Sequence, residues 1–193
     1  MPEATAQREP VRGEGVAGRV ADDLLARVMA FELDDPESPM PFTKRLARDN
    51  RWPLAYAIRV VREYRRFVFL AMRAGHTVVP SEQVDQAWHL HLLYTRSYWD
   101  GLCADVLGRP LHHGPTRGGE QHKHETLYQQ TLDSYARLFD EPPPGDIWPD
   151  VHERFRVAHT GTHVYTGDYW LMPRPGVWWR RLRGLFTPSG GRR

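Results

Sequence analysis

The stretch "PLAYAIRVVREYRRFVFLAMRAG", Pro53–Gly75, decides the fold class of this chain. Its apolar residues recur every three or four positions, which is the periodicity of an amphipathic helix. Pro53 suits the first turn of such a helix, and Gly75 is a typical stop. We therefore predict one long helix from Pro53 to about Ala74. The predicted inward stripe is Leu54, Ala57, Ile58, Val61, Tyr64, Val68 and Met72.

The opposite side of this helix carries several arginines, which are expected to form a solvated face. They are Arg59, Arg62, Arg65 and Arg66.

The flanking segments repeat the helical periodicity and are separated by loops rich in proline and glycine. Further helices are expected over residues 16–32, 43–50, 81–94, 95–107, 125–139 and 151–157. Thr43, Ser81 and Thr95 are the expected N-caps, because their hydroxyls can accept a bond from the first turn. The predicted fold class is mainly α, an irregular bundle of about five to seven helices. An irregular or hairpin segment is expected near residues 158–176.

A length of 193 residues suits one domain that can bury its own core. The expected organisation is a disordered N-terminus over residues 1–15, a helical domain over 16–173 and a basic, aromatic segment over 174–193. Cys103 is the only cysteine, which excludes an intrachain disulfide and a multi-cysteine zinc site. The polar N-terminus and the lack of long apolar runs favour a cytoplasmic protein.

The charge distribution bears on the expected partners. The chain has a net charge of +2, yet residues 174–193 contain six arginines and no acid, so the rest is net acidic. This profile does not suggest a nucleic-acid partner. The Trp, Leu and Arg residues of 174–186 favour a segment that folds back on the domain, or else contacts a protein partner or an anionic membrane surface. No phosphate-binding loop or nucleotide fingerprint occurs, so no nucleotide cofactor is expected.

The segment "VDQAWHLHLLYTRSYW", Val84–Trp99, opens a concentration of histidine: six of ten histidines lie between His89 and His124. Asp85 and His89 are one helical turn apart and therefore share a face. His91 is rotated by about 200° from His89, so one helix cannot direct both at one ion. His91 is more typical of a hydrogen-bonded core residue, although it stays an alternative ligand.

A third ligand would have to come from the following loop, "GRPLHHGP", where adjacent histidines usually point apart. Either His112 or His113 could then complete a two-histidine, one-carboxylate set, which suits Fe(II) or Zn²⁺. Cys103 is a further candidate ligand or a small core residue. The alternative is a structural network in which Asp85 fixes the tautomer of His89 and both order the loop.

The segments "VDQAWHLHLLYTRSYWDGLC", "GRPLHHGP" and "YQQTLDSYARLFDEPPPGDIWP" resemble the glycine-rich domain-containing protein-like family over residues 45–150. The matching residues are Val84, Asp85, Trp88, His89, Tyr98, Cys103, His113, Tyr128, Tyr135, Trp148 and Pro149. The resemblance favours His89 and His113 over His91 and implies no particular reaction.

Two functions follow as expectations. The first is a divalent-metal-binding domain with Asp85, His89 and His113 as ligands and metal-dependent enzyme activity as an extension. There, Tyr98 or His112 would hydrogen-bond the ligands or transfer protons. The second is a non-catalytic protein-interaction module in which the Asp–His pair is structural.

Overall fold

A computed structural model describes residues 23–114 and 121–156, and within these ranges the chain forms helices and no strand. The chain divides after Arg156 into two units, and the described residues all lie in the first. The helices are residues 23–30, α2 (Phe42–Asn50), α3 (Leu54–Arg73), α4 (Glu82–Leu92), the π-helix η1 (Arg96–Leu107), α5 (Gln121–Phe139) and α6 (Val151–Arg156). The mainly α prediction is confirmed. The segments predicted at 1–15, 158–176 and 174–193 lie outside the described residues.

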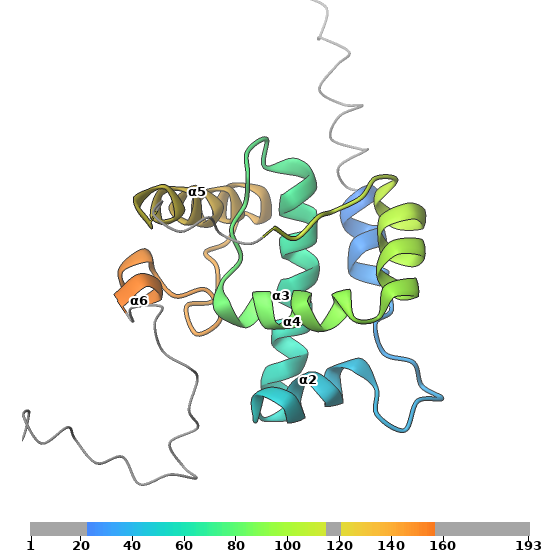
Figure 1. The fold of residues 1–193 in the computed structure, drawn as a ribbon. Helices are drawn as coiled ribbons and strands as arrows, with labels where there is room; N and C mark the ends of the chain where they lie inside the picture. The colour runs from blue at the N-terminus through green and yellow to red at the C-terminus, as the bar shows by residue number, and fades with distance from the viewer. Residues whose placement is uncertain (1–22, 115–120, 157–193) are drawn as a thin grey trace, which may run out of the picture. The chain divides into compact units, whose positions relative to one another are not determined.

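Helix α3 is central to the described helices, since α2, α4 and α5 all contact it (Figure 1). Its covered face includes Val60, Tyr64 and Phe67, each at most 1 % exposed. The predicted stripe was wrong at Leu54 and Ile58, which are 45 % and 56 % exposed. On an ideal helix these two residues are rotated by about 100° from the middle of the buried face. The sequence offers two adjacent apolar faces, and packing covers only one of them.

The arginine side of α3 is less solvated than predicted. Arg65 donates from Nε and Nη2 to the backbone carbonyl of Phe31, at 3.0 and 2.8 Å. Arg66 pairs with Glu63 and Glu141, and its side chain is 12 % exposed. Both guanidinium groups therefore tie α3 to other segments instead of facing water.

The predicted helix ends are partly confirmed. Ser81 caps α4, because its hydroxyl accepts a 3.3 Å bond from the Val84 N–H. Gly75 has a positive φ of 78°, which stops α3 as expected. Thr43 was wrong as a cap: it lies inside α2, and both its N–H and its hydroxyl donate to Asp34, at 2.7 and 2.5 Å.

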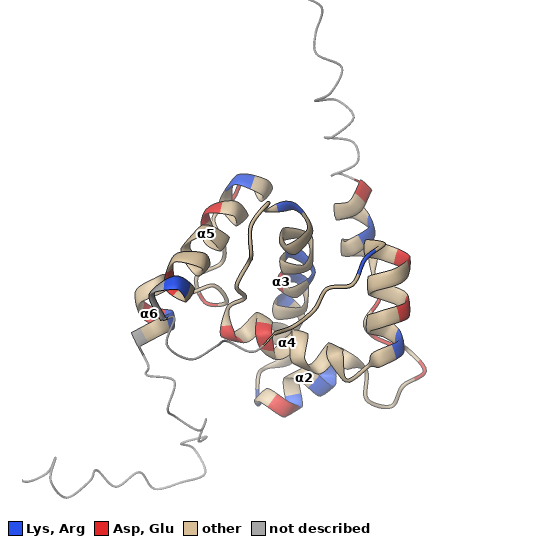
Figure 2. Cartoon of the chain, turned by 45° about the horizontal axis from the view of Figure 1, so that its top comes forward, with Lys and Arg blue, Asp and Glu red and all other residues tan. Residues whose placement is uncertain are grey.

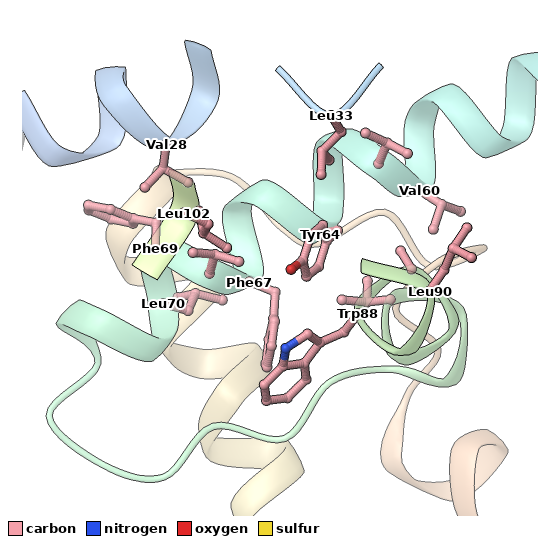
Figure 3. Close-up of a cluster of buried hydrophobic side chains, with 14 of the residues drawn as sticks. Val28, Leu33, Val60, Tyr64, Phe67, Phe69, Leu70, Trp88, Leu90 and Leu102 are labelled. Atoms are coloured by element: carbon pink, nitrogen blue, oxygen red, sulfur yellow. The ribbon is translucent and has the colours of Figure 1, made fainter. Parts of the chain in front are cut away.

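The core of the described residues is rich in aromatic side chains. Figure 3 shows the Phe67 ring beside the Trp88 indole, with ring centroids 5.0 Å apart. On the α5 side of α3, the buried carboxylate of Glu63 accepts bonds from Tyr135 (2.8 Å) and from the indole of Trp148 (3.1 Å). These bonds join α3, α5 and the segment before α6. Within the described ranges, none of the helices combines the length and apolar character needed to cross a membrane.

Candidate metal centre

Helix α4 begins at its N-cap, Ser81, and its helical spacing then sets the direction of each polar side chain. The helix buries Trp88 and His91 against the core. Asp85 and His89, one turn apart, then lie on a more exposed face. Helix α4 alone therefore places a carboxylate and an imidazole side by side.

The segment after η1 brings a second imidazole to this face. Figure 2 shows this segment returning across α4, near the acidic first turn of the helix. Nε2 of His113 lies 3.0 Å from Oδ1 of Asp85. Nε2 of His89 lies 3.8 Å from Oδ2 of the same carboxylate.

The three residues form a compact but accessible group. One potential donor atom from each of Asp85, His89 and His113 lies within 4.8 Å of the other two. The two imidazole ring centroids are 4.5 Å apart. The side chains of Asp85 and His113 are 26 % and 22 % exposed, while that of His89 is 49 % exposed. An ion could therefore reach the group from solvent, and His89 has room to change rotamer.

The return of the chain begins at the end of η1. Gly108 has a φ of 67°, a left-handed conformation that glycine adopts without a Cβ penalty. The N–H of Arg109 then donates a 3.1 Å bond to the carbonyl of Cys103. This cap turns the chain back toward α4.

Tyr98 and Trp88 fix the next part of the path. The Trp88 indole donates a 2.9 Å bond to the Tyr98 oxygen, and the Tyr98 hydroxyl donates to the carbonyl of Leu111. The Trp88 ring also packs edge-on against His113, with centroids 4.5 Å apart. Burial, reinforced by the nearby Cys103, raises the pKa of Tyr98 to about 12, so its phenol stays a neutral donor. Tyr98 thus positions the loop that carries His113.

His91 takes no part in the group, because its imidazole is fully buried. Its Nδ1 lies 2.9 Å from the Tyr64 hydroxyl and its Nε2 3.0 Å from the Ser97 hydroxyl. Burial lowers the pKa of His91 to about 4. Both ring nitrogens are occupied, as expected for a core histidine and not for the alternative ligand considered above.

The other two sequence candidates are also apart from the group. Cys103 is a free thiol buried in η1. The ring of His112 lies 5.6 Å from that of Trp99. Of the adjacent histidines, only His113 contacts Asp85, in agreement with the expectation that such neighbours diverge.

The arrangement has the donor types of a two-histidine, one-carboxylate metal site. Such sites hold non-haem Fe(II), and zinc accepts the same ligands. Around a common ion, donor atoms stand about 3 to 3.5 Å apart. Binding therefore requires the group to contract slightly, and the exposed His89 side chain can supply that movement.

Two contacts that shape the site were missed from the sequence. The packing of Trp88 on His113 and the bond from Tyr98 to Leu111 both depend on a chain reversal between η1 and the loop. The acceptor in the second contact is a backbone carbonyl, which no residue type reveals. The spacing of Asp85 and His89 was the only local signal for the group.

Comparisons with known proteins relate part of this chain to an uncharacterised family. Residues 40–132 match the family model described as UCP032817-like, a region that contains Asp85, His89 and His113. The name glycine-rich domain-containing protein-like is not confirmed by this match. Searches of curated proteins and of solved structures found no match.

Proposed function

We propose that this helical domain binds one divalent transition metal, Fe(II) or Zn²⁺, through Asp85, His89 and His113. The observation that carries the proposal is the convergence of three ligand-type donors within 4.8 Å, from α4 and a loop 28 positions away. The spacing of Asp85 and His89 follows from one helix, whereas the approach of His113 requires a specific chain path.

The chemistry of the shared bond is compatible with a metal. In the geometry described, the Asp85 carboxylate can only accept, so Nε2 of His113 carries the proton between them. A metal ligand must be deprotonated at the coordinating nitrogen. If His113 binds through Nε2, the ion takes the place of that proton and keeps Asp85 and His113 together.

A metal-dependent reaction is a natural extension of this proposal. Two imidazoles and one carboxylate leave coordination positions for water or a substrate. A cavity of about 460 Å³ also lies next to His89, between α2 and α4, with Leu46, Leu90 and Leu93 in its walls. This volume is in the range of small-molecule sites.

The experiment that tests metal binding is elemental analysis of tag-free protein purified without chelators. We expect near-stoichiometric iron or zinc in the wild type, and loss of the metal in Asp85→Asn, His89→Ala and His113→Ala. His152→Ala is the matched control, because His152 is an exposed histidine on α6. Wild-type protein that stays metal-free after reconstitution with Fe(II) and with Zn²⁺ would refute the proposal.

The second candidate function is a non-catalytic interaction module in which the Asp85–His113 bond is structural. The 3.0 Å bond and the packing of Trp88 on His113 favour it, since both anchor the loop without an ion. The partner surface was predicted in residues 174–186, which lie outside the described residues. Under this function, deleting residues 174–193 abolishes partner capture and leaves the unfolding midpoint of the helical domain unchanged.

A further inference from the structure

A second cavity, of about 450 Å³, lies beside Trp88 and is lined by the end of α3 and the segment after η1. None of Asp85, His89 and His113 lines it. Its size falls in the range of small-molecule sites. The lining has two chemically distinct parts, which together indicate a ligand class.

The first part is an apolar floor. Phe67 and Trp88 are almost fully buried and pack together at 5.0 Å (Figure 3), whereas Met72 and Val78 are only partly buried and leave apolar surface for a ligand. Leu111 adds a partly buried side chain, held in place through the bond from Tyr98 to its carbonyl. A rigid floor of this kind suits a planar or compact hydrocarbon body.

The second part is a basic edge formed by His76, Arg109 and His112. Among the described side chains that line this cavity, none is acidic. Nδ1 of His76 faces the Thr77 carbonyl at 3.0 Å and Nε2 faces the Ser134 hydroxyl at 2.8 Å, so this imidazole has no free nitrogen. Arg109 and His112 are therefore the groups that remain for a ligand.

Arg109 is the decisive residue. Its side chain is exposed, and within residues 23–114 and 121–156 its guanidinium has no hydrogen bond or ion pair with another side chain. Its backbone is held by the bond to Cys103, which fixes where the side chain starts. A planar guanidinium whose donors are used by no described residue matches a carboxylate in a two-point geometry.

From these two parts we propose that the cavity bounded by Phe67, Trp88, Arg109 and His112 binds a small organic anion with an aromatic or compact apolar body. The anionic head pairs with Arg109 and His112, and the body packs on Met72, Val78 and Leu111. This site is separate from the proposed metal centre and does not depend on it.

The test is an NMR titration of the full chain in EDTA with four probes: benzoate, 3-phenylpropionate, benzamide and acetate. Benzoate or 3-phenylpropionate should bind saturably. Benzamide, which lacks the charge, and acetate, which lacks the ring, should each bind at least about tenfold more weakly.

Variants then locate the site. Arg109→Gln should weaken the binding of the aromatic anion by about tenfold, and Arg109→Lys by less, because the charge is kept but the two-point geometry is lost. Arg62→Gln, at an exposed arginine of α3, is the matched control and should bind as the wild type does. Circular dichroism confirms that each variant is folded.

Three results would overturn the proposal: no saturable binding of either aromatic anion, equal binding of benzoate and benzamide, or no effect of Arg109→Gln. Because EDTA is present throughout, failure of the metal centre cannot mimic any of them.

Discussion

His113 lies closer to Asp85 than His89 does, although 28 positions separate His113 from Asp85 and only one helical turn separates His89 from it. The long-range contact has good hydrogen-bond geometry, while the local one is a looser approach at 3.8 Å. The two histidines should therefore differ in what their removal costs.

In the presence of EDTA, His113→Ala should lower the free energy of unfolding by about 1–3 kcal/mol. It removes a partner of the half-buried Asp85 and the ring that packs on Trp88. His89→Ala should cost less than about 0.5 kcal/mol, because that side chain is half exposed. Urea denaturation of both variants measures the difference. Equal losses would mean that His113 does not anchor the loop.

Metal addition should stabilise the folded wild type. At a free Zn²⁺ concentration of 100 times the dissociation constant, linkage gives about 2.7 kcal/mol, or roughly 10 °C in the unfolding midpoint. His89→Ala and His113→Ala should lose this response, and His152→Ala should keep it. A shift of the same size in all four proteins would indicate binding elsewhere. Differential scanning calorimetry with and without chelator makes the comparison.

The buried His91 should make the protein sensitive to acid. Burial lowers the folded-state pKa to about 4, below the unfolded value of about 6.5, so the unfolded chain takes up a proton that the folded chain refuses. The contribution of neutral His91 to the free energy of unfolding is therefore complete above pH 6.5 and is lost as the pH falls toward 4. The expected loss is on the order of 3 kcal/mol.

His91→Gln tests this origin, since glutamine cannot titrate. Although less stable at neutral pH, the variant should show a shallower fall in unfolding free energy between pH 6.5 and 4. Urea titrations in EDTA separate this effect from the metal centre. Parallel curves for the two proteins would assign the acid sensitivity to other groups.

Glu63 should be the most sensitive carboxylate in the described core. Glu63→Ala leaves the Tyr135 hydroxyl and the Trp148 indole without their acceptor and removes one partner of Arg66. We expect a loss of about 3 kcal/mol in unfolding free energy. Asp146→Asn, which breaks the exposed pair with Arg59, is the control and should have a much smaller effect. Chemical denaturation of both variants gives the comparison, and similar losses would contradict the anchoring role of Glu63.

Local signals predicted the elements of the fold well. Pro53, Gly75 and Ser81 mark real helix boundaries, because caps and stops act within one turn. Thr43 misled because its best acceptor, Asp34, comes from the preceding loop and not from its own helix. The roles of Arg65 and Arg66 were hidden for the same reason: their partners lie on other segments.

In the candidate site, too, the local features could be predicted from the sequence and the long-range contacts could not. The shared face of Asp85 and His89 and the inward direction of His91 are helix geometry and could be calculated from spacing. Which of His112 and His113 approaches Asp85 depends on the turn at Gly108 and on the bond from Tyr98 to Leu111. Those interactions exist only once the chain has reversed, so periodicity could not supply them.

The π-helical form of η1 has a consequence for how this chain can vary. A π-helix closes its bonds five residues apart instead of four, so each turn holds roughly one residue more than an α-helical turn. Deleting one residue between Arg96 and Leu107 would let the segment relax into an ordinary helix, with little loss of helix. The later residues would then rotate by about 100° relative to Tyr98, and the turn at Gly108 would no longer direct His113 to Asp85. Single-residue deletions in this segment should therefore be rarer among homologues than substitutions on its exposed side.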